Sequence, residues 1–228
     1  MKEFFKKIIY RNYYLYCFSM FLYHFLRRLK RKNSTTGCTI VNKGVARIKK
    51  DIIGCNNIIC IGSKTVLHNT HIRIRGNNNK IYFEEGCMVG PKCSFWMEGN
   101  DIQIKIGRNT TFTHSVHFCI QEDHMCAIVG EGCMFSNHIT VRTSDGHPIY
   151  KINENVRINK PKSVYIGKYV WIAPDTKIMK GSYIGDESII GSDSMVNGEI
   201  PSNVLAVGHP AKVIKENIKW TREQIIPN

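Results

Sequence analysis

The 228-residue sequence lacks the features that define several classes of protein. Its nine cysteines form an odd total with no Cys-x-x-Cys pair, which argues against a disulfide framework or a zinc knuckle. No short basic segment is followed by a small-residue cleavage site, so we expect a retained leader and a cytoplasmic protein. The uncharged run at 12–26 is shorter than the roughly 20 apolar residues of a membrane-spanning helix. The length and the 43% hydrophobic content fit one globular domain with an appendage.

Acidic residues are scarce, since 18 Asp and Glu oppose 32 Lys and Arg in a chain of net charge +14. Residues 1–32 hold nine of these bases against one acid, and ten of the twenty Phe and Tyr side chains. Because the charge is local, it does not indicate a nucleic-acid partner. A basic aromatic helix at 1–32 suits the inner face of an anionic cell membrane. It equally suits packing on the main domain or on a sister subunit, and composition leaves both interpretations open.

A six-residue repeat is the strongest pattern in the sequence. An α-helix has 3.6 residues per turn, so it places positions i and i+6 on different faces. A coil with flat sides, each carrying one inward aliphatic residue and ending in a tight corner, does have this period. We therefore predict an all-β parallel β-helix whose stacked coils bury a ladder of branched side chains. The ladder positions are Ile166, Ile172, Ile178, Ile184, Ile190 and Val196.

Upstream segments extend the predicted solenoid. Short alternating strands are predicted at 59–62, 81–83, 102–107 and 128–130, between turns rich in glycine and asparagine. Residues 143–160 form a long excursion, and excursions of that length are usually functional. We expect the regular coils to end near Pro201 and a helix to run from Lys212 to Gln224. The predicted parts are an N-terminal helical extension at 1–32, a β-helix domain at 33–211 and a C-terminal helix and tail at 212–228.

Three motifs, at 166–172, 178–181 and 200–214, resemble those of the hexapeptide-repeat acyltransferases. This family of left-handed β-helices includes maltose, galactoside and polysaccharide O-acetyltransferases, and the similarity spans roughly residues 55–215. The leader and the segment Ser-Asp-Gly-His at 144–147 favour its capsular and lipopolysaccharide members. The resemblance implies acetyl-coenzyme A as donor and a sugar or polysaccharide hydroxyl as acceptor. It also implies a homotrimer with active sites between its subunits.

The resemblance places a catalytic histidine in the excursion, where we assign His147. An alcohol is a poor nucleophile at neutral pH, so acyl transfer to a hydroxyl needs a base beside it. Histidine, with an ordinary pKa of about 6.5, supplies a neutral imidazole at pH 7. Asp145 either orients this imidazole or stabilises the turn. Trp171 flanks the thioester in the resembling enzymes, and a packing role is the alternative.

Further residues are assigned to the two ligands. The candidate contacts to the pantetheine arm and phosphates of coenzyme A are Ala173, Lys180, Gly191, Ser192 and Lys212. Ala173 stands where the family usually has glycine after its Trp-Ile pair. His117 and Glu122 are candidate contacts to the acceptor, and a hydrogen-bonded structural role is an equal alternative for His117.

Two other functions remain open. A metal-dependent lyase on the same solenoid, as in the γ-type carbonic anhydrases, would use some of the five histidines from His114 to His147. A scaffold without chemistry would join a membrane polysaccharide-synthesis complex through residues 1–32. The Trp171 coil and the Pro-Ala-Lys tail at 210–212 favour acetyl transfer, and that interpretation expects no metal.

Overall fold

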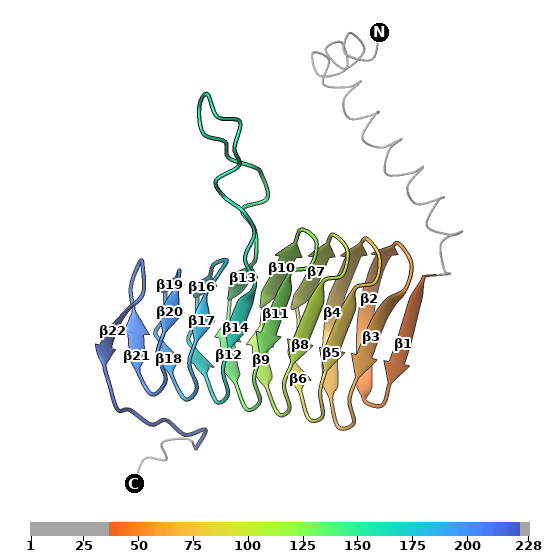
Figure 1. Cartoon of the computed structure of the whole chain (residues 1–228). Helices are drawn as coiled ribbons and strands as arrows, with labels where there is room; N and C mark the ends of the chain where they lie inside the picture. The colour runs from red at the N-terminus through yellow and green to blue at the C-terminus, as the bar shows by residue number, and fades with distance from the viewer. Residues whose placement is uncertain (1–36, 224–228) are drawn as a thin grey trace, which may run out of the picture. The chain divides into compact units, whose positions relative to one another are not determined.

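The computed structural model describes residues 37–223, and the N-terminal extension predicted at 1–32 lies outside them. The described residues contain strands and turns but no helix, and therefore no helix long and apolar enough to cross a membrane. The strands wind into a parallel β-helix (Figure 1). This architecture confirms the predicted all-β fold class.

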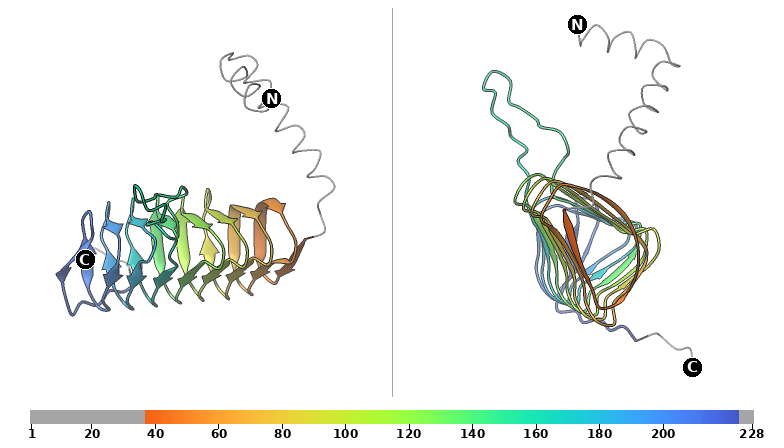
Figure 2. Two further views of the ribbon diagram at one scale, coloured as in Figure 1. Left: turned by 45° about the horizontal axis from the view of Figure 1, so that its top comes forward. Right: turned by 90° about the vertical axis from the view of Figure 1, so that its right-hand side faces the viewer.

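In the middle of the solenoid, each coil contributes one strand to each of three faces, and the coils superpose when viewed along the solenoid (Figure 2). The first face is a separate 8-stranded sheet. Its strands are β1 (Cys38–Asn42), β3 (Asn57–Ile61), β5 (Lys80–Phe83), β8 (Gln103–Ile106), β11 (Cys126–Val129), β14 (Val164–Ile166), β17 (Tyr183–Ile184) and β20 (Glu199–Ile200).

The second and third faces are the two halves of a 14-stranded sheet that meet at β4 (Val66–Arg75), with which β2 (Val45–Ile53) pairs. The second face contains β6 (Met88–Val89), β9 (Thr111–His114), β12 (Met134–Asn137), β15 (Trp171–Ile172), β18 (Ile189–Ile190), β21 (Leu205–Val207) and β22 (Lys212–Lys215). The third face contains β7 (Ser94–Glu98), β10 (His117–Gln121), β13 (Thr140–Arg142), β16 (Lys177–Ile178) and β19 (Met195–Val196). The first residues of β4 pair with β6 and its last residues with β7.

The predicted ladder positions are buried in successive coils. The paired residues are Ile166 with Ile184, Ile172 with Ile190, and Ile178 with Val196, each 18 residues apart. One coil of this region therefore consists of three six-residue units. The strands predicted upstream form as β3, β5, β8 and β11. There the coils are longer, because Ile81 pairs with Ile104 and Phe95 with Phe118, 23 residues on.

The excursion leaves the coils after β13 and returns before β14, at the corner between the third and first faces (Figure 2). Its two arms pair as an antiparallel ribbon, since the Ile158 amide donates to the Ile149 carbonyl at 2.9 Å. At the base, the Lys162 amide donates to the Thr143 carbonyl at 3.0 Å. The excursion thus has its own backbone hydrogen bonds and a closed base.

The predicted helix after Lys212 is wrong. Residues Lys212–Lys215 form β22, which pairs antiparallel with β21, and residues 216–223 have no regular structure. The last coil of a solenoid exposes unpaired backbone groups, and an adjacent extended segment satisfies them. Pro201 does not end the coils either. It occupies a corner, where no ladder donor is needed, and β21 continues the stack beyond it.

Candidate active site

The base of the excursion is tied to the corner of the preceding coil. The Thr143 hydroxyl accepts a hydrogen bond from the backbone amide of Gln121 at 3.0 Å and donates one to the backbone carbonyl of Gln121 at 3.1 Å. The Ser144 hydroxyl donates to Glu122 at 2.5 Å. On the returning arm, Arg157 donates two hydrogen bonds to Glu122, at 2.5 and 2.7 Å. A bidentate pair of this kind fixes orientation as well as distance, so Glu122 joins both arms to the solenoid.

Asn159 holds the backbone around His147. Its side-chain amide is buried and donates to the His147 carbonyl and to Asp145, both at 2.8 Å. Its side-chain oxygen accepts from the Ile149 amide at 2.7 Å. Asp145 also pairs with Lys180, from the next coil, at 2.5 Å. The segment that carries the predicted base is therefore anchored by a closed polar network.

The two carboxylates of this network are held in their ionised form. Hydrogen bonds from Arg157 lower the pKa of Glu122 below its ordinary value, and those from Lys180 lower the pKa of Asp145. Asp145 thus stabilises the turn, which is one of the two roles predicted for it. The Lys180 side chain forms an ion pair with Asp145, and the Glu122 side chain binds Arg157 of the excursion. Neither arrangement tests the ligand roles predicted for Lys180 and Glu122.

His147 lies exposed at the foot of the excursion. Its neighbours Gly146 and Pro148 line a hollow of about 560 Å³ on the outside of the corner. The other lining residues are Glu98, Gly99, Gln121, Glu122, Asp123, Ser144, Tyr150 and Arg157. The hollow is large enough for a sugar ring and offers several hydrogen-bonding groups; the His147 side chain lies outside its lining, between two residues that belong to it.

Trp171 lies elsewhere on the molecule. It faces outward from β15 on the second face, and its ring centroid is 5.9 Å from that of Trp220 in the C-terminal tail. The Trp220 indole donates to the Tyr169 carbonyl at 2.7 Å. In a three-sided coil, the corner between the third and first faces is opposite the second face. One chain therefore does not bring His147 and Trp171 together.

The residues predicted to contact coenzyme A divide into two groups. Ala173, Gly191 and Ser192 follow β15 and β18, so they stack at one corner of successive coils. Ala173 is buried and Gly191 half-buried, and the corner carries no bulky side chain at these positions. Lys212, at the start of β22, pairs with the end of β21 near the same corner. Lys180 is at the corner of the excursion instead.

His117 faces outward from β10 and is hydrogen-bonded to the Ser94 hydroxyl at 2.8 Å. Burial lowers the pKa of His117, and His138 adds to this effect. His138 lies beside His114, with ring centroids 5.3 Å apart, and 3.4 Å from Asp175. Within residues 37–223, however, no group of three or more His, Cys, Asp or Glu side chains is arranged to hold a metal ion.

Sequence reasoning missed three residues of the site. Arg157 and Asn159 lie inside the predicted excursion, but Arg157 binds Glu122, 35 residues away, and Asn159 binds the His147 carbonyl, 12 residues away, so no local pattern indicates these contacts. Trp220 lies within the segment predicted to be helical, although a tryptophan in a polar tail is itself a signal of a contact with the domain.

A parallel β-helix of hexapeptide coils, interrupted at one corner by an excursion that carries a histidine, defines a class of bacterial transferase. The family model for the bacterial transferase hexapeptide (six repeats) matches residues 163–198. The polysialic acid O-acetyltransferase of Neisseria meningitidis is 32% identical over 174 residues, which cover 75% of this chain and 79% of that protein. The chain belongs to this family of acetyltransferases.

Two further comparisons agree with this assignment. The polysialic acid O-acetyltransferase of Escherichia coli O1:K1 is 35% identical over 152 residues, 67% of this chain. The match spans only 45% of that longer relative. The crystal structure of the polysialic acid O-acetyltransferase OatWY superposes with a TM-score of 0.77 at 29% identity. It covers 83% of this chain and 91% of that one.

Proposed function

We propose that the protein transfers an acetyl group from acetyl-coenzyme A to a hydroxyl of a bacterial surface polysaccharide, with His147 as general base. The observation that carries the proposal is the exposed His147 on a rigidly anchored segment, beside a hollow of about 560 Å³. Polysialic acid is the acceptor to test first, because two relatives are named for it.

The polar network gives His147 a defined position. When bound, acetyl-coenzyme A would supply an acetyl group activated as a thioester. The neutral imidazole of His147 takes the proton from the acceptor hydroxyl as its oxygen attacks, and returns it to the departing sulfur, so the base is regenerated. Asn159 and Asp145 fix the backbone that carries the imidazole, which reduces the entropy lost on reaching the reactive geometry.

The donor would occupy the corner formed by Ala173, Gly191 and Ser192. This corner suits an extended, flexible arm because it has no bulky side chains. It is separated from His147 by the width of a coil, so a complete site needs the corner of one chain and the base of another. A homotrimer with shared sites satisfies this requirement.

Two variants test whether the site is shared. His147→Ala and Trp171→Ala should each reduce turnover in a homogeneous oligomer. Co-expressed, the two chains should regain activity, because some sites then combine an intact His147 with an intact Trp171. Failure of the mixture to exceed either parent, with mixed oligomers present by mass spectrometry, would rule out a shared site.

Release of coenzyme A from acetyl-coenzyme A in the presence of polysialic acid tests the reaction itself. His147→Asn should lower turnover by roughly 10²- to 10⁴-fold, the usual contribution of a general base. His124→Asn is the matched control, because His124 is another exposed histidine of this corner and lies beside Asp101 in the preceding coil rather than in the excursion. Equal activity of the two variants would exclude His147 as the base. A metal-dependent activity without acetyl transfer would favour the lyase, and no turnover with any glycan would favour the scaffold.

The location of the protein is a separate proposal that rests on sequence alone. The basic aromatic segment 1–32 would hold the enzyme at the inner face of the cell membrane or in a synthesis complex. Removing residues 1–32 should leave coenzyme A release intact and shift the protein to the soluble fraction. Full membrane retention of the truncated chain would contradict this.

A further inference from the structure

Four outward side chains on the third face form a single column across four coils. Arg73 pairs with Trp96, Trp96 with Cys119, and Cys119 with Arg142. We call this set the arginine–tryptophan column. Neighbouring strands lie about 4.8 Å apart, so the column spans about 14 Å along the solenoid. That length is sufficient for more than one sugar unit of a bound polymer.

Among residues 37–223, neither arginine of this column forms a salt bridge with a carboxylate, although the charge of Arg142 helps to lower the pKa of Asp145. The Arg73 guanidinium lies over the Trp96 ring, 4.6 Å from the centroid. The Nε atoms of Arg73 and Arg142 and the indole nitrogen of Trp96 are covered and have no hydrogen-bond acceptor among residues 37–223. The adjacent Arg75 differs in having a salt bridge, with Asp51 at 2.7 Å. Because these covered atoms cannot reach a ligand, an anion would be bound by the terminal nitrogens of the two half-buried guanidinium groups.

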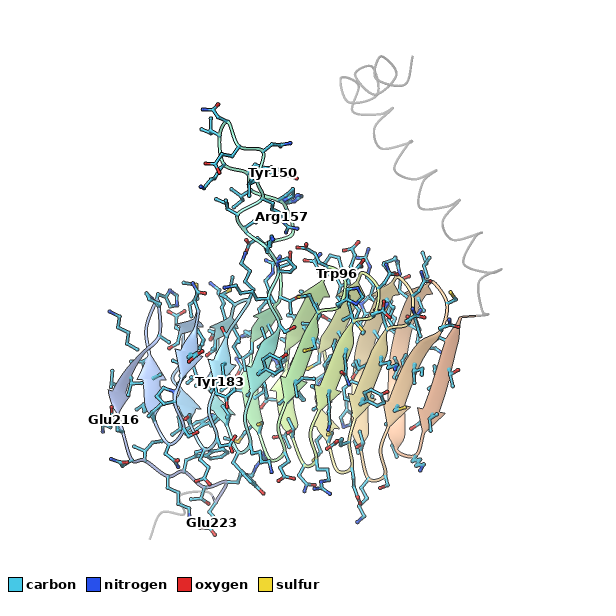
Figure 3. The ribbon with its side chains drawn as sticks, in the orientation of Figure 1. Trp96, Tyr150, Arg157, Tyr183, Glu216 and Glu223 are labelled. Atoms are coloured by element: carbon cyan, nitrogen blue, oxygen red, sulfur yellow. The ribbon has the colours of Figure 1, made fainter. Side chains whose placement is uncertain are left out.

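The column begins beside the proposed base. A Cβ atom built on Gly146 would lie 3.8 Å from an Arg142 guanidinium nitrogen and 3.9 Å from the Gln121 side-chain oxygen. Arg142 therefore lies directly beneath the residue that precedes His147. From there the column runs toward the N-terminal coils. Trp96 lies at the edge of the solenoid from which the excursion rises (Figure 3).

The chemistry of the column selects the class of ligand. Guanidinium groups bind carboxylates through paired hydrogen bonds, and the Trp96 indole, with Arg73 over one face, holds that guanidinium in place beside an apolar ring edge. The protein's own nearby carboxylate does not compete, because Asp145 is held by Lys180. Arg73 and Arg142 are three strand spacings apart, with Trp96 between them. This separation fits a polymer in which each sugar carries a carboxylate.

We propose that the arginine–tryptophan column is an acceptor subsite that binds the carboxylates of a polyanionic glycan while a neighbouring sugar lies at His147. The inference rests on the proposed acetyl transfer and names the class of acceptor. Arg142 holds the unit next to the acetylated sugar, and Arg73 holds a unit farther along the chain. Affinity therefore rises with the length of the acceptor.

The test uses the full-length protein and the variants Arg73→Met and Arg142→Met. Lys177→Met is the matched control, because it removes an exposed charge from β16 on the same face but outside the column. Binding of polysialic acid is measured by calorimetry without acetyl-coenzyme A, and KM and kcat are then measured with it. The second probe is the same polymer with its carboxylates reduced to alcohols.

Each arginine variant should weaken binding of polysialic acid about tenfold, the loss expected for one charge-assisted contact. Arg73→Met should raise KM at unchanged kcat, and neither variant should alter the response to the reduced polymer. Equal binding by both arginine variants and Lys177→Met overturns the inference. Dissociation of the oligomer by Arg73→Met also overturns it, because the column is then a subunit interface. If the wild type acetylates no glycan, the proposed function fails, whatever the binding results.

Discussion

The two halves of the solenoid are built from coils of different size. From β3 to β13, paired residues are 22 or 23 positions apart, and the interior contains stacked phenylalanines. From β14 to β19 they are 18 apart, and the interior contains isoleucine and valine. A longer coil encloses a wider cross-section, which only a larger side chain fills at the density of a protein interior. Coil length and core composition therefore change together.

The excursion lies where the two coil types meet. The wide coils present the arginine–tryptophan column and the hollow beside His147, whereas the narrow coils present the smooth corner at Ala173 and Gly191. The proposed acceptor contacts thus lie on the wide half, and the proposed donor corner lies on the narrow half. This comparison leads to three stability predictions.

Removal of an aromatic ring from the wide core should have the largest effect. Phe95 is fully buried and its ring centroid lies 4.9 Å from that of Phe83 and 5.1 Å from that of Phe118. Phe95→Ala should lower the free energy of unfolding by about 3–5 kcal/mol, measured by urea denaturation. Ile172→Val in the narrow core should cost only about 0.5–1.5 kcal/mol. Similar losses at both sites would mean that the wide core is not filled by its rings.

Replacing a buried polar side chain at a corner should cause the second-largest loss of stability. In the wide coils, Asn79 donates to the Gly99 carbonyl at 3.0 Å and accepts from the Ile102 amide at 2.9 Å. Asn79→Ala leaves both groups unpaired, so we expect a loss of about 2–4 kcal/mol. In the narrow coils, the Ser182 hydroxyl donates to the Met179 carbonyl at 2.7 Å.

Ser182→Ala should cost only about 1 kcal/mol, because that carbonyl loses one neutral hydrogen bond. Differential scanning fluorimetry ranks the two corner variants. A larger fall in melting temperature for Ser182→Ala than for Asn79→Ala would refute the ranking.

Low pH should weaken the anchors of the excursion, at the junction between the two halves. Of the three changes, this one should have the smallest effect on overall stability. The pKa of Glu122 is lowered by Arg157, and that of Asp145 by Lys180. A carboxylate whose pKa is lowered by folding stabilises the folded state at pH values above its ordinary pKa. This contribution is lost as the pH falls through the lowered pKa. Below about pH 4.5, the ordinary value for Glu122, the anchors should weaken.

Pepsin should then cut the excursion increasingly at lower pH while the coils remain intact. The control at pH 7 is chymotrypsin, which should cut Arg157→Met faster than the wild type at the exposed Tyr150. Cleavage that is equally slow at pH 5 and pH 3 would show that the two ion pairs do not anchor the excursion.

The sequence predicted the solenoid because its period is local. Ile166 and its equivalents repeat over a few residues, and each repeat contains its own corner. It also predicted the excursion and a histidine within it. It did not predict the strand at Lys212–Lys215, because that strand depends on the exposed edge of β21.

The local repeat is enough to define the β-helix and to place His147 in the segment that interrupts it. Only the folded coils bring Glu122 to Arg157, 35 residues later, and align Arg73 with Arg142 across four coils. The physical reason is that these contacts depend on the register between successive coils. A change in coil length by a few residues brings a different residue into each column, and coil length depends on how the whole interior is filled.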